Sequence, residues 1–280
     1  MHRRNIGHIN FKKENERNFF FRSFFLLFVG KIVSFVKNRI PMYDFTIIIK
    51  SKDNVVPFNY EHDLHAFVYS HISDVGYGSK VKNFIHSNLK ESNISKCKVP
   101  CGVWSKKGIS FYTDPCFTIR TNDISVANSI VKNIKVGVSV FGGFKVVDFY
   151  AYEVEDLHYK TKFNTFFSSP ILVSPKWNKY KTIPEEILCD VENYLEKNVE
   201  RKANEIGVTL GEFKIKIEKQ FKCCDIMTKK YTEDEFGNAF KETGRNFLLS
   251  ITGTDIAKNF IYQNGLGRSV GLGFGFLNVK

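Results

Sequence analysis

The residues best suited to chemistry in this sequence gather in a glycine-rich segment at the C-terminus. The last 16 residues read GLGRSVGLGFGFLNVK and contain glycines at 265, 267, 271, 273 and 275. Glycine has no Cβ, so backbone N–H groups in such a segment can approach an anion closely, and converging N–H groups bind phosphate. The segment therefore predicts either a phosphate-binding loop or a tight turn followed by a bulged last strand.

The known nucleotide-binding glycine motifs do not fit the position of this segment. A dinucleotide-binding motif follows a strand, opens a helix and precedes an acidic residue about 20 residues later. Only 15 residues follow Gly265. A kinase or P-loop protein would need its lysine, metal ligands and remaining domain downstream of the glycines. The position therefore excludes these classes.

A second group of chemically active side chains lies on a helix predicted from Asn59, a good N-cap residue, to about Asp74. At 100° per residue, His62, His65 and Tyr69 fall within about 60° of one another. The opposite, core-facing side is expected to hold Leu64, Phe67, Val68, His71 and Ile72. The helix thus presents a polar and aromatic face away from the core.

The cysteines do not predict a metal site or disulfides. The six are Cys97, Cys101, Cys116, Cys189, Cys223 and Cys224, and they form no C-x-x-C pair. The first three lack an obvious fourth ligand, and no cleavable secretory signal precedes them. We therefore expect reduced thiols, a cytoplasmic location, and no metal or cofactor.

The elements that must position these residues follow the order β-α-β-β-α-β in the first part of the body. The alternating run YDFTIIIK predicts a first strand. The predicted elements are a strand at 43–50, the helix from Asn59, a short helix at 79–88, strands at 94–104 and 107–119, a helix at 123–134 and strands within 135–156.

The second part repeats this order without residue-level similarity between the two parts. Its predicted elements are a strand at 169–175, a helix at 184–205, strands within 211–224 and 246–252, a helix at 254–263 and a last strand at 272–279. The sequence thus predicts an α+β protein of two tandem ferredoxin-like (RRM-like) domains. We place them at 42–160 and 161–280, with a linker near 157–168.

Residues 1–41 form a hydrophobic and basic extension ahead of these domains. The run FFFRSFFLLFVGKIVSFV at 19–36 is broken by Arg22 and Lys31, whereas a membrane span needs about 20 apolar residues. It could be a weak membrane anchor, a surface-seeking amphipathic helix, or a non-native extension translated from upstream of the true start. Because Met42 directly precedes the first predicted strand, we favour the third reading and expect no stable membrane association.

The charge is consistent with a polyanionic partner but does not establish one. The net charge is +12, of which residues 1–41 contribute nine basic and two acidic residues, a net +7. The remaining 32 basic and 27 acidic residues leave a net +5 for the body. The body's excess of positive charge is therefore modest.

The terminal segment resembles a known signature. G265-L-G267-R-S-V-G271-L-G273-F-G275 is similar to the G-x-G-x5-G-x-G loop of the CRISPR repeat endoribonucleases of the repeat-associated mysterious protein (RAMP) superfamily, archaeal-type branch. VPFNYEHDLHAFVYSHI at 56–72 and SFYTDPCFTI at 110–119 resemble two further blocks of that family, so the similarity spans roughly 42–280. The family's loop often carries lysine, where this chain has Arg268.

The resemblance implies a metal-independent endoribonuclease that cuts precursor crRNA within repeats. In this family a substrate 2'-hydroxyl attacks the adjacent phosphate and leaves 2',3'-cyclic phosphate and 5'-hydroxyl ends. The matching positions are His86 as general acid/base, Tyr69 at the 2'-oxygen and Lys96 on the charged phosphorane, with Lys98 as the alternative lysine and His65 as the reserve histidine. The implied RNA-binding residues are Gly265, Gly267, Arg268, Gly271, Gly273 and Gly275.

The implied partners are CRISPR repeat RNA, as precursor and mature crRNA, and subunits of a CRISPR effector complex. Homodimerisation is left open. Some family members bind repeats without cutting, so a non-catalytic repeat-binding subunit is the alternative function. A protein associated with a membrane through residues 19–36 is a third reading.

Overall fold

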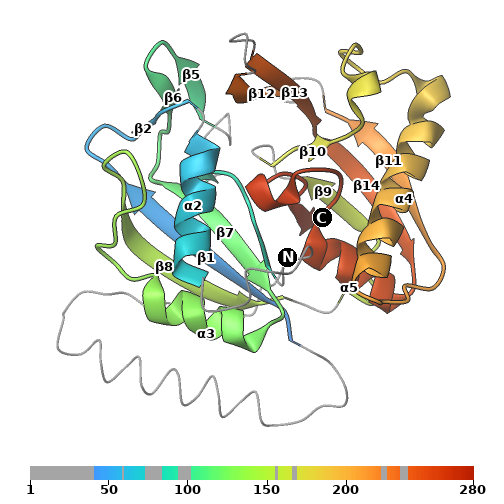
Figure 1. Ribbon diagram of the computed structural model, residues 1–280, viewed down its shortest axis with the longest axis horizontal. Coiled ribbons are helices and arrows are strands. Elements are labelled where there is room, and N and C mark those ends of the chain that lie inside the picture. Colours follow the sequence, from blue (N-terminus) through green and yellow to red (C-terminus); the bar gives the residue numbers. More distant parts are fainter. Residues whose placement is uncertain are drawn as a thin grey trace.

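The computed structural model describes residues 41–58, 60–72, 84–93, 102–154, 157–165, 169–221, 226–233 and 239–280. Two α+β units lie side by side, and the C-terminal loop lies between them (Figure 1). The predicted extension, apart from its last residue, Pro41, lies outside the described residues. So do Lys96, Lys98 and the first five residues of the helix predicted at 79–88.

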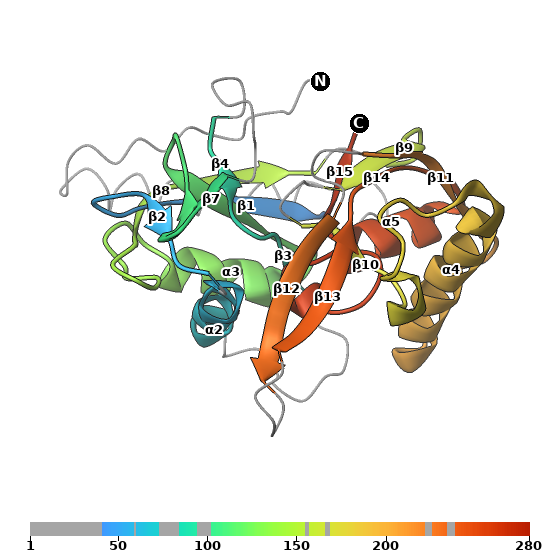
Figure 2. The same ribbon diagram turned by 90° about the horizontal axis from the view of Figure 1, so that it is seen from above.

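The first unit is a ferredoxin-like domain. Its elements are β1 (Tyr43–Lys50), α2 (Tyr60–Ile72), β3 (Phe84–His86), β7 (Pro115–Thr121), α3 (Ile124–Asn133) and β8 (Lys145–Glu153). The strands form an antiparallel sheet in the order β3-β7-β1-β8, and the short β4 (Lys90–Glu91) also pairs with β7. Both helices cover the same face of this sheet (Figure 2).

The residue pattern of this domain accounts for its sheet and helices. In β1, Phe45, Ile47 and Ile49 alternate toward the helices and are fully buried, as a strand with one core face requires. The helix α3 begins where the Asp123 carboxylate accepts from Ser125 N at 2.7 Å, which satisfies one of the free N–H groups of the first turn.

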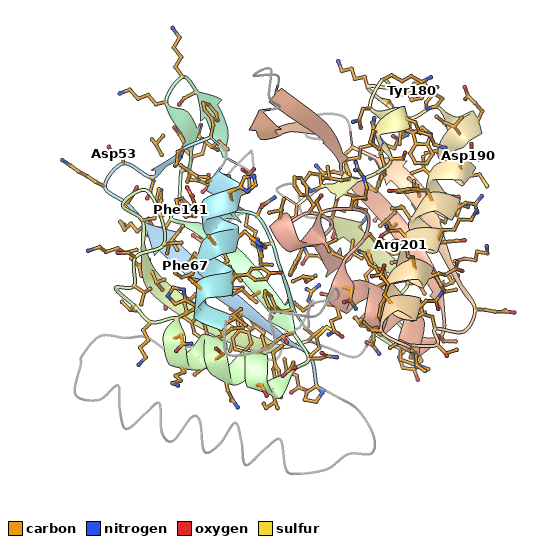
Figure 3. The ribbon with its side chains drawn as sticks, viewed as in Figure 1. Asp53, Phe67, Phe141, Tyr180, Asp190 and Arg201 are labelled. Carbon is orange, nitrogen blue, oxygen red and sulfur yellow. The ribbon has the colours of Figure 1, made fainter. Side chains whose placement is uncertain are left out.

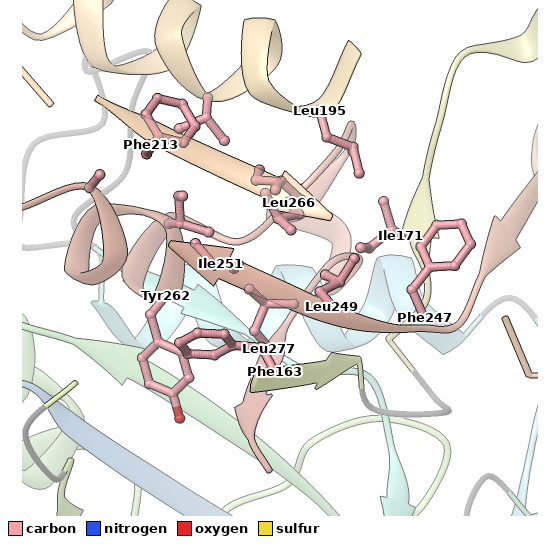
Figure 4. Packing of buried hydrophobic residues seen from close by; sticks show 14 of the residues in the cluster. Phe163, Ile171, Leu195, Phe213, Phe247, Leu249, Ile251, Tyr262, Leu266 and Leu277 are labelled. Carbon is pink, nitrogen blue, oxygen red and sulfur yellow. The ribbon is translucent and has the colours of Figure 1, made fainter. Parts of the chain in front are cut away.

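The second unit has the same topology. Its elements are β9 (Lys162–Thr165), α4 (Leu188–Glu205), β11 (Phe213–Gln220), β14 (Phe247–Gly253), α5 (Asp255–Asn264) and β15 (Leu277–Val279), and the sheet order is β11-β14-β9-β15. Figure 4 shows its core, in which Phe163 and Leu277 lie close to Tyr262, while Leu195 reaches the core from α4.

Two small sheets extend from these domains. The first consists of β2 (Val55–Val56), β6 (Gly108–Ser110) and β5 (Val103–Ser105), and the second of β10 (Ile171–Leu172), β13 (Ala239–Arg245) and β12 (Ile226–Glu233). Three short 3-10 helices complete the described elements: η2 (Pro175–Trp177), η3 (Glu185–Ile187) and η4 (Val270–Leu272).

The structure corrects three sequence predictions. Residues 84–86, predicted in a helix, form β3, because so short an apolar segment fits a strand edge as well as a helix face. The first strand of the second domain is β9, inside the predicted linker; only Phe163 and Thr165 are buried there, too few to mark a strand. The predicted strand at 107–119 is two strands, β6 and β7, in different sheets.

The domain boundary at about 160 remains our proposal. Two separate clusters of buried residues form the cores of the two domains. Met42 is an exception, since it precedes β1 and yet packs in the core cluster of the second domain. Its carbonyl oxygen accepts from Val154 N at 2.8 Å, just after β8.

We expect a chain that begins at Met42 to keep its fold, because every described residue except Pro41 is still present. Its melting temperature should lie within about 3 °C of the full chain, which corresponds to about 1 kcal/mol for a protein of this size. Thermal unfolding of both chains checks this. A large loss of stability on removing 1–41 would contradict the reading of this segment as an extension.

Among the described residues, no helix has the length and apolar character needed to cross a membrane. The run at 19–36 is not part of the described chain.

Candidate functional site

The C-terminal loop links α5 to β15 and is held by its own backbone. Gly265 ends α5 with φ +66°, and Leu266 N donates to Gly275 O at 3.0 Å, which closes the base of the loop. Between them η4 lies against α2 and β3 of the first domain. Figure 1 shows the loop, in red, between the two domains.

Three of the glycines are required by the close packing of this loop. A Cβ on Gly275 would stand 1.9 Å from Leu266 O, and one on Gly267 would stand 2.5 Å from Leu172 O. A Cβ on Gly265 would stand 2.8 Å from Gly275 O. All three have positive φ, a backbone conformation that residues other than glycine rarely adopt. These glycines therefore shape the loop.

The other two glycines face the first domain. A Cβ on Gly273 would stand 2.4 Å from Asn88 Oδ1. Gly271 is open by comparison, with Tyr69 Oη at 3.7 Å and His65 Cε1 at 3.9 Å from a built Cβ. Gly271 thus marks the point where the loop meets the polar face of α2.

Two histidines of the first domain converge on one carbonyl oxygen of this loop. His65 Nδ1 lies 2.6 Å from Gly271 O, and His86 Nε2 lies 2.9 Å from the same atom. A carbonyl oxygen only accepts, so each ring donates an N–H to it. The two ring centroids are 5.9 Å apart, and the Tyr69 ring is 4.0 Å from that of His65. The predicted residues His65, Tyr69, His86 and Gly271 are therefore together.

His86 is enclosed in this arrangement. Its side chain is on β3 and is 1% exposed, and its second ring nitrogen, Nδ1, lies 3.1 Å from Ser87 O. A neutral imidazole has one N–H and can donate to only one of these two carbonyl oxygens, whereas the protonated ring can donate to both. His65 is partly exposed. The closed loop therefore covers His86 and accepts a hydrogen bond from its ring through Gly271 O.

The remaining predicted site residues are placed differently. Arg268 Nε and Nη2 both donate to Val173 O, at 3.2 and 3.1 Å, so its guanidinium is held by the second domain. His62 is exposed and makes none of the contacts around Gly271 described above. His71, predicted on the core face, is partly exposed, because its Nδ1 turns back to Phe67 O at 2.8 Å. Phe67 itself packs in the core from α2 (Figure 3).

The described part of the chain contains no group of three or more His, Cys, Asp or Glu side chains that could hold a metal ion. Of the three cysteines considered for a metal site and set aside, Cys97 and Cys101 lie outside that part. Cys116 is buried in β7, where burial raises the pKa of its thiol.

Sequence reasoning missed two polar contacts across the domain interface. Asn88 N donates to Ser169 Oγ at 2.8 Å, which joins the segment after β3 to the second domain. Arg120 on β7 is fully buried and bonds to both domains. Neither residue lies in a motif, and an arginine in an alternating strand is ordinarily expected to face solvent.

The sequence of the second domain is similar to a known family. Residues 153–279 match the family model described as "CRISPR associated protein Cas6, C-terminal". Over these residues the chain is similar to Cas6. The match includes the whole glycine loop and confirms the predicted resemblance to the CRISPR repeat-processing family of the RAMP superfamily.

Solved structures related to Cas6 share the fold. One, described as "Characterization of a Cas6-related gene from Pyrococcus furiosus", has a TM-score of 0.61 and 18% identity and covers 86% of this chain and 98% of that chain. A second, "An RAMP protein binding different RNA substrates", has a TM-score of 0.58, 18% identity and coverage of 86% and 99%. A third, "CRISPR associated protein Cas6", has a TM-score of 0.58, 15% identity and the same coverage. No curated protein matched the chain.

These matches confirm the predicted fold class of two tandem ferredoxin-like domains. At such low identity the likeness in structure concerns the fold, while the sequence match concerns the Cas6-like second domain.

In the Cas6-like loop, Gly275→Ala and Gly271→Ala should differ in their effect. Gly275→Ala should lower the free energy of unfolding by more than about 2 kcal/mol, because its Cβ meets Leu266 O and its φ is +65°. Gly271→Ala should change it by less than about 1 kcal/mol, since Gly271 has no positive φ and no contact below 3.7 Å. Urea denaturation of both variants measures this. Equal losses would contradict the distinction between the tightly packed Gly275 and the more open Gly271.

Lys202 on α4 lies beside the start of this loop. Its Nζ donates to Gly265 O at 3.5 Å. Burial lowers the pKa of Lys202 to about 8; the neighbouring Arg201, visible on α4 in Figure 3, lowers it further and Glu205 opposes the shift. The unfolded chain titrates this group near 10.5, so it binds more protons than the folded protein between the two values. Stability from this group therefore rises with pH from about 8 to about 10.5.

Lys202→Met should accordingly stabilise the protein at about pH 7, by on the order of 1 kcal/mol, because it removes a charge that burial disfavours. The gain should shrink as the pH approaches about 10, where the native lysine is neutral in the folded protein. Urea denaturation of the native and variant proteins at both pH values gives this difference. A gain that does not change with pH would contradict the assigned shift.

Proposed function

We propose that the protein is a CRISPR-associated endoribonuclease that cuts precursor crRNA within its repeats. The observation that carries this proposal is the meeting of His65 and His86 at Gly271 O, in the loop of a domain that matches Cas6. Two imidazoles and a tyrosine at one point provide the groups that proton transfer needs near neutral pH.

The proposed reaction uses a nucleophile that is part of the substrate. The 2'-oxygen forms a bond to the adjacent phosphorus as the bond from phosphorus to the 5'-oxygen breaks. The 2'-hydroxyl proton passes to a base on the protein, and an acid returns a proton to the leaving 5'-oxygen. The products are a 2',3'-cyclic phosphate and a 5'-hydroxyl. Because the nucleophile is already attached, catalysis requires alignment, proton transfer and charge stabilisation, and no metal-activated water.

We assign proton transfer to His86 and alignment of the 2'-oxygen to Tyr69, with His65 as the histidine that acts if His86 does not. His86 is covered by the loop, so RNA must take over the hydrogen bond that Gly271 O now accepts. A 2'-hydroxyl or a phosphate oxygen can accept from the same N–H group. In this account the loop carbonyl holds the place of a substrate oxygen in the free protein.

Charge stabilisation of the phosphorane is assigned to Lys96, or to Lys98, on the family resemblance alone. A lysine ammonium close to the non-bridging oxygens stabilises charge that develops in the transition state.

We propose that RNA contacts the open centre of the glycine loop. Residues 268–272 are partly or fully exposed, whereas 265–267 and 273–277 are buried. The N–H groups of Leu266, Arg268 and Gly275 already donate to carbonyl oxygens of the protein. Gly265, Gly267, Gly273 and Gly275 would thus support RNA binding indirectly, by shaping the loop, while Gly271 and the backbone beside Arg268 meet the RNA.

The alternative function is repeat binding without cleavage, as a subunit of a CRISPR effector complex. The enclosure of His86 favours this alternative if the loop does not open. Under either function we place the protein in the cytoplasm with crRNA as its partner.

Incubation of the protein with a labelled repeat RNA in EDTA separates the two functions. The proposed enzyme shortens the RNA at one position within the repeat. Tight binding with no cleavage above background would leave only the binding subunit.

A further inference from the structure

Arg120 is buried at the interface of the two domains, where its guanidinium forms an ion pair with Asp44. The side chain is 0% exposed. Its Nε and Nη2 donate to the two oxygens of Asp44 at 2.7 and 2.8 Å, a bidentate pair between neighbouring strands β7 and β1. Burial alone would lower the pKa of Arg120, but the Asp44 carboxylate raises it, so the group stays charged.

The same guanidinium reaches into the second domain and contacts both ends of the glycine loop. Its Nη1 donates to Tyr262 O at 3.1 Å and to Leu277 O at 2.9 Å. The Tyr262 and Phe276 rings lie on the guanidinium, with centroids 3.6 and 4.2 Å from Cζ. Tyr262 precedes Gly265, the first glycine, and Leu277 follows Gly275, the last one. One side chain therefore holds the two stems of the loop together.

Arg120 also belongs to the strand beside the one that carries His86. In the register of β3 and β7, Ile85 is opposite Arg120 and His86 is opposite Ile119. Two neighbouring residues of β7 therefore hold the site: Ile119 pairs with His86, and Arg120 bonds to both stems of the loop. Gly271 O, at the centre of the loop, bonds to His86 Nε2.

Stability alone does not explain an ion pair at this place. Apolar side chains of similar volume often replace a buried ion pair without loss of stability, since both charges lose their hydration. An apolar side chain cannot donate directional hydrogen bonds to two carbonyl oxygens, whereas the planar guanidinium has five N–H donors in a fixed geometry.

We propose that Arg120 is a positioning residue, which fixes the glycine loop on the first domain so that Gly271 stands against His86 and substrate is aligned there. The catalytic part of this inference rests on the proposed function. The inferred positioning of the loop by Arg120 is independent of the proposed function.

The decisive variant is the double substitution Asp44→Asn with Arg120→Met, which removes both charges together. It should melt closer to the native protein than Arg120→Met alone does, because no unpaired buried charge is left. Single-turnover cleavage at saturating protein should nevertheless fall by about 10-fold or more, with repeat affinity within about threefold, since small displacements of reacting groups are costly. Amide hydrogen exchange within 265–275 should be faster.

Two further variants serve as a substitute for the double variant and as a stability control. Arg120→Lys keeps a positive charge beside Asp44 but lacks the planar set of N–H donors, so it should show the same loss of rate. It replaces the double variant if that protein does not fold. Ile130→Ala opens a cavity under α3, where Ile130 is 0% exposed. It should lower the melting temperature while leaving the cleavage rate and the exchange of 265–275 unchanged when both are measured well below that temperature.

Native cleavage rate and native loop exchange in a folded double variant would overturn the proposal. An equal rate loss in Ile130→Ala, at a similar fall in melting temperature, would overturn it as well. If the native protein does not cut repeat RNA, the proposed function fails, and exchange within 265–275 decides on Arg120. Faster exchange in the double variant then supports the assignment of loop positioning, and native exchange refutes it.

Discussion

Replacing His86 by alanine is expected to slow single-turnover cleavage of repeat RNA by about 10² to 10⁴-fold, while repeat affinity stays within about threefold. A residue that transfers protons acts mainly in the transition state, so its loss should lower the rate much more than the binding. His86 lies 2.9 Å from Gly271 O, at the centre of the only loop in the described chain that combines five glycines with contacts to both domains. Quench experiments at saturating protein measure the rate, and filter binding measures the affinity.

His62→Ala is the matched control for this experiment. His62 lies on α2, one turn from His65, but is exposed, so its removal should leave the rate unchanged. Native cleavage by the His86→Ala variant would show that the assignment is wrong. His65→Ala would then be the next variant, because His65 Nδ1 bonds to the same carbonyl oxygen.

A repeat RNA with a single 2'-deoxyribose on the 5' side of the cut should bind with native affinity and resist cleavage completely. The missing hydroxyl is the proposed nucleophile, and no water or metal takes its place in this mechanism. Competition binding and a cleavage time course with matched ribose and deoxyribose RNAs measure the two effects.

A second RNA with its deoxyribose one nucleotide away serves as control and should be cut at the native rate. Cleavage of the RNA that is deoxy at the cut itself would contradict attack by the 2'-hydroxyl. It would also indicate that another nucleophile is at work.

Much of the fold was predictable because most elements have clear patterns. The alternation of Phe45, Ile47 and Ile49 marked β1, and the amphipathic segments of α3, α4 and α5 were predicted close to their observed bounds. The missed strands include the eight-residue β12 and the seven-residue β13, which lie between the segments predicted at 211–224 and 246–252. Two other missed strands are short. β3 has three residues and β9 has four, and segments of that length carry too few buried positions to show a period of two.

The site was predictable only in part. The spacing of His65 and Tyr69 placed both on one helix face, and this was confirmed, because helical geometry is local. The meeting of His65 with Gly271 joins residues 206 positions apart in sequence, which no local pattern encodes. Arg120 was missed for a related reason. In the run PCFTIRT it occupies a position that would face solvent in an isolated domain, and it is buried only because the second domain packs on that side.

The central claim is tested most directly by the ends of the RNA that the native protein produces in EDTA. The account predicts one cut per repeat, with a 2',3'-cyclic phosphate on the upstream product and a 5'-hydroxyl on the downstream product, identified by mass spectrometry and by direct phosphorylation of the new 5' end. Cleavage that requires added magnesium, or products with 3'-hydroxyl and 5'-phosphate ends, would contradict it.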